Sequence, residues 1–553
     1  MGRMKTALSA AAIYTFCLIV FACNPVELRN YLEKMTGFEG VIYVNDQSGN
    51  DGNRGMRSEP LKTIQAGIDK AHSYMKDGLA DSVDVYVSEG NYEITNGTEN
   101  IGDYISIVEG VSLYGGYSSD FSTRDPTLFV SQITDTSSGV EDTAAIRAYD
   151  GLTEKTVVDG FTIQAGSGIG FPGSNALDIE RASPTITNNI ILGGHGAAGI
   201  LAITIDIYDN SSPNIENNTI VGGNSIGSNI GIVIADSSHP IVRNNTITGG
   251  SAGNCTAIVC WNTQAQIEHN DIDGGEGTKT LGIHIMQDCF VNIRHNEIYG
   301  GSATSSAGGI LVESDMIAID GNSISGGSAS ANETTGIFCR QTSWVGIQNN
   351  TIFGGTASGS GNANALYLDK SYAGICNNTI AGGQSDWGAA IYLTNESHPS
   401  INNNIIFCLA TNSRYCIYES SSNTWYAGSI RNNDFAEISG STVMYRPYTE
   451  VELDTLISIE ALAHASGNWD EDPQLADLDG DDDIITTIGD NDWHLAAGSP
   501  KEIRQGGLDG ALLDWGFYAD KEGDWRTNLT EGPNDGPSND DAGGWSMGAY
   551  ERD

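Results

Sequence analysis

Short stretches of alternating apolar and polar residues recur through the middle of the chain with a period of 25 to 29 residues. Each repeat contains the pattern apolar-x-Asn-Asn-x-Ile-x-Gly-Gly, as in Ile215 to Gly223 and Val242 to Gly250. About ten residues before the second asparagine lies another motif, a small residue followed by an aliphatic one, such as Gly231-Ile232. A period of two predicts strands, so each repeat holds three short strands separated by turns. The second asparagine falls at Asn189, Asn218, Asn245, Asn270, Asn296, Asn322, Asn350, Asn378, Asn404 and Asn433.

Repeats of this length indicate a solenoid in which every repeat is one coil covered by its neighbours. Three short strands per coil predict an all-β fold, a right-handed parallel β-helix of about ten to twelve coils. Asparagines stacked at a turn can bond from coil to coil, and the Gly-Gly pair marks the next corner. The aliphatic residue that follows the asparagines should fill the interior: Ile191, Ile220, Ile247, Ile272, Ile298, Ile324, Ile352, Ile380 and Ile406.

The first 23 residues resemble a bacterial lipoprotein signal. Arg3 and Lys5 precede a short apolar stretch that ends at Val20-Phe21-Ala22-Cys23, with Cys23 as the lipidated residue. A plain secretory signal with a coincidental cysteine is the alternative. The resemblance predicts an exported chain held at the bacterial cell envelope, at the outer membrane or cell surface, by lipid alone.

Composition excludes several classes of protein. The chain has 553 residues, 69 of them glycine, and a formal net charge of −45. Its 39% hydrophobic content is enough to fill a core, which argues against general disorder. The electrostatic field of so acidic a chain repels phosphate, and we therefore expect no nucleic-acid partner. Nothing in the pattern calls for an oligomer, and we expect a monomer.

Several stretches resemble known bacterial surface proteins. Tyr43 to Tyr92 and Val111 to Pro126 resemble the domain of unknown function that opens many such proteins, and Asp472-Pro473 through Glu551 resembles their usual ending. With the repeats, these stretches place the chain beside the right-handed parallel β-helix superfamily that includes pectate lyases. The resemblance implies the fold and leaves the ligand open.

The expected organisation has five parts. Residues 1–22 are the signal, 23–39 a linker, 40–150 an N-terminal cap with the first coils, 151–437 the repeats, and 438–553 a C-terminal tail and cap. Leu61, Ile64, Ile68 and Ala71 share one face of a predicted helix. That helix would cover the N-terminal end, where strand edges would otherwise stay open.

Two columns of outward residues are the candidate ligand surface, because this superfamily binds ligands on an outer face. One step after the inward aliphatic residue the column is Val233, Val259, His284, Leu311, Phe338, Tyr367, Tyr392 and Tyr418. Two steps further it is Ala235, Trp261, Met286, Glu313, Arg340, Asp369 and Thr394. Aromatic faces stack on sugar rings, so Trp261, Phe338, Tyr367, Tyr392 and Tyr418 are the predicted carbohydrate contacts. The alternative is that the tail packs over these rings.

Catalytic chemistry has four candidate residues. Glu313, Arg340 and Asp369 occupy one position on three successive coils, and His284 lies close by. Two carboxylates two coils apart lie about 9 to 10 Å apart, near the upper limit for an inverting glycosidase. The alternative is a charge ladder of little energetic consequence. No arginine pair resembles the pectate lyase motif, and Gly194-His195-Gly196 lacks the aspartates that precede it in polygalacturonases.

An acidic loop is the candidate metal site. Asp477, Asp479, Asp481 and Asp483 place oxygens at alternate positions, as calcium loops do. The loop departs from an EF-hand in the position of Gly480, and a solvated acidic turn is the alternative. Seven cysteines beyond residue 23 make an odd number with no Cys-x-x-Cys, so we expect buried thiols rather than a disulfide framework.

The sequence therefore favours a lipid-anchored surface protein that binds carbohydrate or another surface ligand. An extracellular polysaccharide lyase or glycoside hydrolase acting in the outer groove, and a purely structural surface protein, are the alternatives. The missing catalytic motifs place binding ahead of catalysis.

Overall fold

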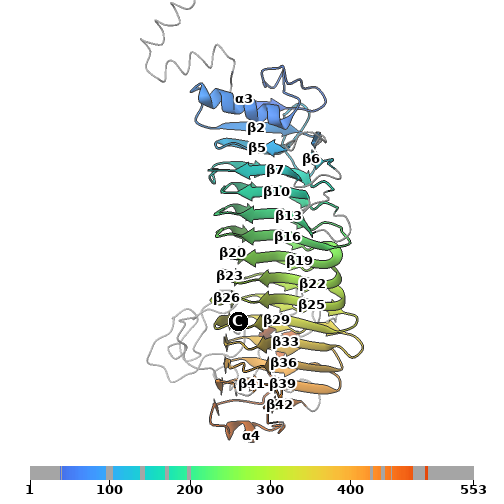
Figure 1. Cartoon of the computed structure of the whole chain (residues 1–553), viewed down its shortest axis with the longest axis vertical. Coiled ribbons are helices and arrows are strands. Elements are labelled where there is room, and N and C mark those ends of the chain that lie inside the picture. Colours follow the sequence, from blue (N-terminus) through green and yellow to red (C-terminus); the bar gives the residue numbers. More distant parts are fainter. Residues whose placement is uncertain are drawn as a thin grey trace, which may run out of the picture.

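A computed structural model describes residues 38, 40–94, 104–137, 143–167, 174–195, 201–423, 427–436, 442–449, 451–477 and 492–495. Three parallel sheets run the length of this part of the chain, and each coil contributes one strand to each sheet. Figure 1 shows the coils stacked along one axis, with helix α3 (Ile64–Lys76) at the upper end and helix α4 (Leu456–Glu460) at the lower end. The predicted parallel β-helix of about a dozen coils is confirmed.

Sheet 1 contains the first strand of each coil. In spatial order its members are β1 (Val41–Val44), β2 (Val83–Ser88), β5 (Val111–Tyr117), β8 (Val157–Asp159), β11 (Thr185–Thr187), β14 (Asn214–Glu216), β17 (Ile241–Arg243), β20 (Gln264–Glu268), β23 (Phe290–Arg294), β26 (Ile317–Asp320), β30 (Val345–Gln348), β34 (Ala373–Cys376), β37 (Ser400–Asn402), β40 (Ser429–Arg431) and β43 (Ala465–Ser466).

Sheet 2 contains the second strand of each coil. Its members are β3 (Gly90–Ile94), β6 (Ser131–Asp135), β9 (Phe161–Gln164), β12 (Ile190–Leu192), β15 (Thr219–Val221), β18 (Thr246–Thr248), β21 (Asp271–Asp273), β24 (Glu297–Tyr299), β27 (Ser323–Ser325), β31 (Thr351–Phe353), β35 (Thr379–Gly382), β38 (Ile405–Cys408) and β41 (Asp434–Phe435).

Sheet 3 contains the third and longest strands. Its members are β4 (Ile105–Ser106), β7 (Thr143–Tyr149), β10 (Ser174–Glu180), β13 (Leu201–Tyr208), β16 (Ser228–Ala235), β19 (Ser251–Trp261), β22 (Glu276–Ile285), β25 (Ser302–Val312), β29 (Glu333–Arg340), β33 (Asn362–Asp369), β36 (Trp387–Thr394), β39 (Ser413–Glu419) and β42 (Val443–Arg446). Two short strands, β28 (Ser328–Ala329) and β32 (Thr356–Ala357), continue the start of β25. A separate antiparallel pair joins β44 (Leu475–Asp477) to β45 (Asp492–Leu495).

The aliphatic column fills the interior as predicted. Ile220, Ile247 and Ile298 are each 0% exposed, and the rest of the column from Ile191 to Ile406 is equally buried. Register between neighbouring strands pairs these residues directly, as Ile247 with Ile272. Sheets 1 and 3 add further inward Ile, Val and Leu side chains, so one continuous core runs through the stack.

The two asparagines of the motif have different roles. The first sits at the turn with a positive φ, as at Asn217 (57°) and Asn244 (54°). The second is buried and joins neighbouring coils: the backbone N–H of Asn218 donates to Asn245 Oδ1 at 2.9 Å. Asn245 Nδ2 in turn donates to the carbonyl of Ile215 at 2.8 Å. The ladder extends one coil past the predicted series, because Asn468 accepts from the N–H of Asn433 at 3.1 Å.

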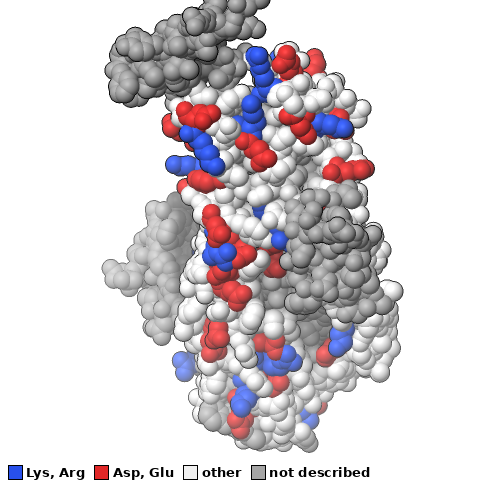
Figure 2. Space-filling view, turned by 45° about the horizontal axis from the view of Figure 1, so that its top comes forward, with Lys and Arg blue, Asp and Glu red and all other residues white. Residues whose placement is uncertain are grey.

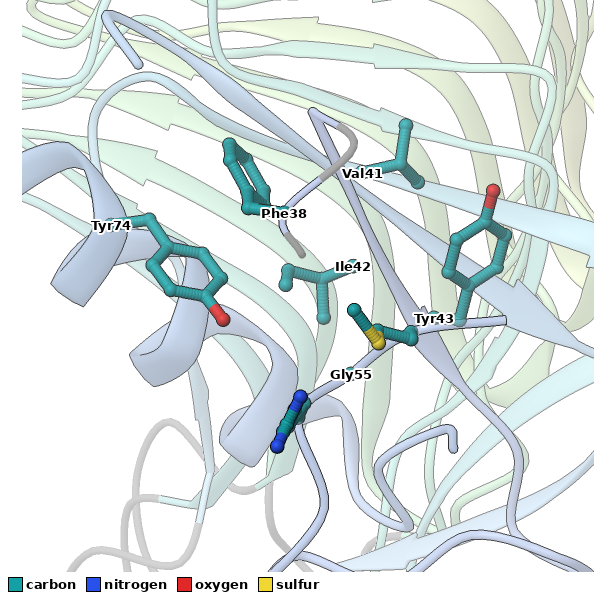
Figure 3. A pocket seen from close by; sticks show the side chains of 8 residues that line it. Phe38, Val41, Ile42, Tyr43, Gly55 and Tyr74 are labelled. Carbon is teal, nitrogen blue, oxygen red and sulfur yellow. The ribbon is translucent and has the colours of Figure 1, made fainter. Parts of the chain in front are cut away.

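At the N-terminal end, the predicted helix is present as α3. Leu61 is buried but lies before the helix, in a β-bridge with Val44, because Thr63 caps the helix at its N-terminus. Ile64, Ile68 and Ala71 are buried, and α3 contacts β1 and β2. Figure 3 shows Phe38 and Tyr74 on either side of the space above Ile42, with ring centroids 4.5 Å apart. The cavity among these side chains measures about 10 Å³, which is room for a single water. The space around Ile42 is therefore too small for a ligand.

The seven cysteines are buried thiols, as expected. Burial raises the pKa of Cys255 to about 11 and that of Cys339 to about 12. A thiol with so high a pKa is protonated and unreactive at neutral pH, so these cysteines act as small apolar core residues.

Candidate functional site

The outward face of sheet 3 carries the two predicted columns. Register pairs Val259 with His284 and Leu311 with Phe338. It continues from Phe338 through Tyr367 and Tyr392 to Tyr418. These residues alternate with buried Ile and Leu, so their side chains must point away from the core. Counting positions in the repeat therefore placed the columns in the register that the structure shows.

Three of the four candidate catalytic side chains meet. His284 Nε2 lies 2.7 Å from Glu313 Oε2, and Arg340 Nε donates to Glu313 Oε1 at 2.7 Å. Partial burial opposes ionisation of Glu313, but the hydrogen bonds from His284 and Arg340 outweigh it. The pKa of Glu313 is therefore lower than its ordinary value, and Glu313 is a carboxylate at neutral pH. A carboxylate held in this way accepts hydrogen bonds and is poorly suited to donate a proton as a general acid.

Asp369 belongs to the same column but has a different partner. It pairs in register with Arg340, yet Asp369 Oδ1 accepts a hydrogen bond from Asn395 Nδ2 at 2.7 Å. Arg340 donates to Glu313. The two strand steps between Glu313 and Asp369 correspond to about 10 Å. Arg340 lies on the strand between these two carboxylates.

The aromatic residues form a continuous strip, which we define as Phe338, Tyr367, Tyr392 and Tyr418. Phe338 stacks on Tyr367 with ring centroids 4.5 Å apart, and Tyr392 stacks on Tyr418 at 5.3 Å. Tyr367 and Tyr392 meet edge to face at 4.8 Å. All four side chains are half-buried, so each keeps part of its surface open to solvent. Burial raises the pKa of Tyr367 to about 12, so its hydroxyl is neutral at physiological pH.

Sequence reasoning missed three members of this surface. Trp387 lies edge to face against Tyr418 at 5.1 Å, and Tyr415 lies 4.8 Å from Tyr418. Arg446 places its guanidinium 4.5 Å from the Tyr418 ring centroid. Trp387 and Tyr415 stand near the starts of β36 and β39, outside the two columns that were counted. Their aromatic character in two consecutive repeats was the signal that could have found them.

Two hollows flank the bonded side chains of His284, Glu313 and Arg340, which we call the polar cluster. One of about 400 Å³ lies toward the starts of the strands, with Lys279, His284, Leu311, Glu333 and Phe338 among its lining residues. The other, of about 500 Å³, lies toward the ends of the strands and is lined by Trp261, Met286, Gln287, Glu313, Arg340 and Gln341. Trp261 is 50% exposed and lies on β19, apart from the strip, so it contributes to the second hollow instead.

Other predicted sites fall outside the described residues. Cys23 and Asp479, Asp481 and Asp483 are not described, and for Asp477 only the backbone is described. Within the described ranges, no group of three or more His, Cys, Asp or Glu side chains could hold a metal ion. None of the helices in the described part of the chain has the length and hydrophobicity needed to span a bilayer.

Charge on the described surface is mixed. Figure 2 shows acidic and basic side chains interspersed along the face that it displays. Around the strip and the polar cluster, Arg340 is paired with Glu313. Charged groups of both signs therefore lie beside the strip, with Arg446 over the Tyr418 ring.

Two family models match the chain. Residues 47–265 match the family described as "Protein of unknown function (DUF1565)", and residues 256–435 match "Right handed beta helix region". The chain is therefore a right-handed parallel β-helix protein whose N-terminal part carries this domain of unknown function. No curated protein matches it.

Solved structures with similar architecture include three of different kinds. The Dettilon tailspike protein is 14% identical over 73% of this chain and 67% of its own, with a TM-score of 0.42. The A-module of the Azotobacter vinelandii mannuronan C-5 epimerase AlgE4 is 16% identical over 71% of this chain and 94% of its own, with a TM-score of 0.33. The Streptococcus pneumoniae surface protein and adhesin PfbA is 11% identical over 66% and 94%, with a TM-score of 0.33. Similarities this weak identify neither ligand nor activity.

Proposed function

We propose that the protein is an exported, lipid-anchored surface protein that binds uncharged carbohydrate along the outward face of sheet 3. The observation that carries the proposal is the strip Phe338, Tyr367, Tyr392 and Tyr418, whose half-exposed rings lie on four successive strands. Apolar faces of sugar rings pack on such aromatic surfaces. Carboxylate, guanidinium and amide groups in the adjoining hollow supply the partners for sugar hydroxyls.

A direct test is binding of neutral polysaccharides in affinity gels. Tyr367→Ala and Tyr392→Ala should each weaken binding about fivefold, because one stacked aromatic contact contributes about 1 kcal/mol. Tyr372→Ala is the matched control, since Tyr372 is a 39% exposed tyrosine outside the strip. If no neutral polysaccharide binds, or if the strip variants bind as the control does, the strip is not a carbohydrate site.

A polysaccharide-cleaving enzyme is the second candidate, because Glu313 and Asp369 belong to the same outward column, on either side of Arg340. In that case cleavage of a bound polysaccharide should vanish in Glu313→Ala or Asp369→Ala while binding persists. The pairing of Glu313 with both His284 and Arg340 favours the binding role, since it leaves no protonated carboxyl at that position.

The anchor rests on the sequence of residues 1–23 alone. Fatty-acid labelling of the expressed protein should depend on Cys23 and disappear in Cys23→Ala. Labelling that survives this substitution would remove the anchor from the proposal and leave the binding surface unaffected.

A further inference from the structure

A second group of aromatic side chains lies on the outward face of sheet 1, near the N-terminal end. Tyr86 and Tyr114 pair in register on β2 and β5, and Tyr43 continues the row on β1. The centroids of Tyr86 and Tyr114 are 6.0 Å apart. Tyr117 stacks on Tyr86 at 4.4 Å with an interplanar angle of 17°. We call Tyr86, Tyr114 and Tyr117 the tyrosine platform.

The platform is specific to these coils and does not follow from the repeat. The same outward column of sheet 1 continues from Tyr114 to Asp159, then to Thr187 and Glu216. Polar residues therefore occupy this position in the coils that follow. Three tyrosine rings in one place exceed what the coil geometry requires, and each is half-buried, so part of its surface stays accessible to a ligand.

One side of the platform is held rigid. The Arg124 guanidinium lies 5.5 Å from the Tyr114 ring centroid and 5.8 Å from that of Tyr117. Arg124 Nε also donates to the carbonyl of Gly115 at 2.9 Å, and Arg124 forms an ion pair with Asp159. The rings are therefore fixed in place before any ligand arrives, which lowers the entropy cost of binding.

The charges around the platform select against ionic ligands. Arg124 is neutralised by Asp159. Asp84 lies two residues before Tyr86, on the same face of β2. Burial raises the pKa of Asp84, and burial together with the nearby Asp84 raises the pKa of Tyr114. Flat rings bordered by the Arg124–Asp159 ion pair and by the Asp84 carboxyl group fit a ligand with apolar faces and hydroxyl groups, and they fit neither a polyanion nor a nucleic acid.

The platform and the strip are far apart. β5 and β30 are eight strand steps apart along sheet 1, which corresponds to about 40 Å. The strip lies on sheet 3 beside β30, whereas the platform lies on sheet 1. A short oligosaccharide cannot reach both surfaces, but a long polysaccharide or two separate chains can.

We propose that the tyrosine platform is a second contact surface for uncharged polysaccharide, so that the protein binds such polymers at two separate places. The chemical class of the ligand rests on the proposed function, whereas the location of the surface does not. Two linked contacts raise the apparent affinity for a polymer above that of either surface alone.

The test uses the full chain in native gels that contain a mixed-linkage β-glucan, a xylan or a galactomannan. Tyr117→Ala should weaken retardation about fivefold, and Tyr86→Ala combined with Tyr117→Ala should weaken it further. Tyr117→Leu is the second variant, because it keeps apolar volume and loses the flat ring. Tyr372→Ala is again the control, and unchanged melting temperatures show that the variants fold.

The outcomes separate the two surfaces. Weakening by both the platform and the strip variants supports the inference. If only Tyr367→Ala and Tyr392→Ala weaken retardation, or if Tyr117→Leu binds as the unsubstituted protein does, the platform is not a polysaccharide surface and the proposed function stands. If only the platform variants weaken it, the platform stands and the strip assignment falls. If none of the three polysaccharides retards the protein, both are overturned.

Discussion

At the scale of single residues, the buried asparagine is the most constrained side chain of the repeat. Asn322 accepts from the backbone N–H and from Nδ2 of Asn296, at 2.9 and 3.0 Å. Its own Nδ2 donates to the carbonyl of Ile293 at 2.9 Å. No other side chain of this size offers an acceptor and two donors in the same plane. Each asparagine therefore satisfies backbone groups at a corner where no strand pairing reaches them.

Replacing one such residue should be costly. Asn322→Ala leaves the Asn296 N–H and the Ile293 carbonyl buried without partners, so we expect the free energy of unfolding to fall by about 3 kcal/mol. Urea unfolding measures the loss. Thr246→Ala, an exposed change on β18, should cost less than about 0.5 kcal/mol. A loss below about 1 kcal/mol for Asn322→Ala would mean that the ladder adds little to stability.

At the scale of elements, the corner between sheets 2 and 3 depends on glycine for two separate reasons. Gly301 has a φ of +87°, and a Cβ there would also collide with the carbonyl oxygen of Gly275 in the preceding coil. Gly151, which lies at a different corner, between β7 of sheet 3 and β8 of sheet 1, has a similar φ of +85° but nothing within 4 Å of a Cβ. Comparing Gly151 with Gly301 therefore separates the cost of a positive φ from the cost of crowding between coils.

Alanine at these two positions should have different effects. Gly151→Ala should lower the free energy of unfolding by about 1 kcal/mol, the cost of a left-handed backbone. Gly301→Ala should cost about 3 kcal/mol or more, because the coils must also move apart. Thermal and urea unfolding of both variants provide the comparison. Equal losses would show that the corner is limited by φ alone and that neighbouring coils adapt.

The strands of sheet 3 show where prediction from the repeat reached its limit. The residues after each Gly-Gly pair, such as Ser328 to Thr335 and Thr356 to Ala363, vary in length from repeat to repeat as loops do, but they begin as the short strands β28 and β32. They pair with the start of β25 and with each other, because neighbouring coils supply edges to which they can bond. A segment's own sequence does not reveal such an edge.

At the scale of the whole molecule, the chain carries a formal net charge of −45. Part of it lies in the acidic loop Asp477 to Asp483, for which calcium binding stays a prediction. Calcium that binds only the folded chain raises stability by mass action.

We therefore expect 5 mM calcium to raise the melting temperature by a few degrees relative to EDTA. This concentration is about a hundred times the dissociation constant of a weak calcium site, so it should saturate the loop. Asp479→Asn combined with Asp481→Asn should remove the increase. Magnesium is the control ion, because a flexible loop of carboxylates favours the larger cation. An equal response to both ions, or none to calcium, would leave the loop as a solvated acidic turn.

The sequence by itself determined the coil, the inward column, the stacked asparagines and the composition of the outward columns. It could do so because a solenoid converts sequence period into spatial neighbourhood: residues one repeat apart must lie on adjacent strands. Phe338, Tyr367 and Tyr392 were placed side by side on that ground alone, and so was the column that holds Glu313.

Only the tertiary structure decided which partners the outward side chains contact. Rotamers choose partners across strands, so Glu313 bonds His284 and Arg340 while Asp369 bonds Asn395. The bonded pairs lie one repeat apart, so the period of the sequence brings them within reach but does not select which partner each side chain takes. The contact of Arg124 with the rings of the tyrosine platform joins residues of the same coil, so the period carries no information about it.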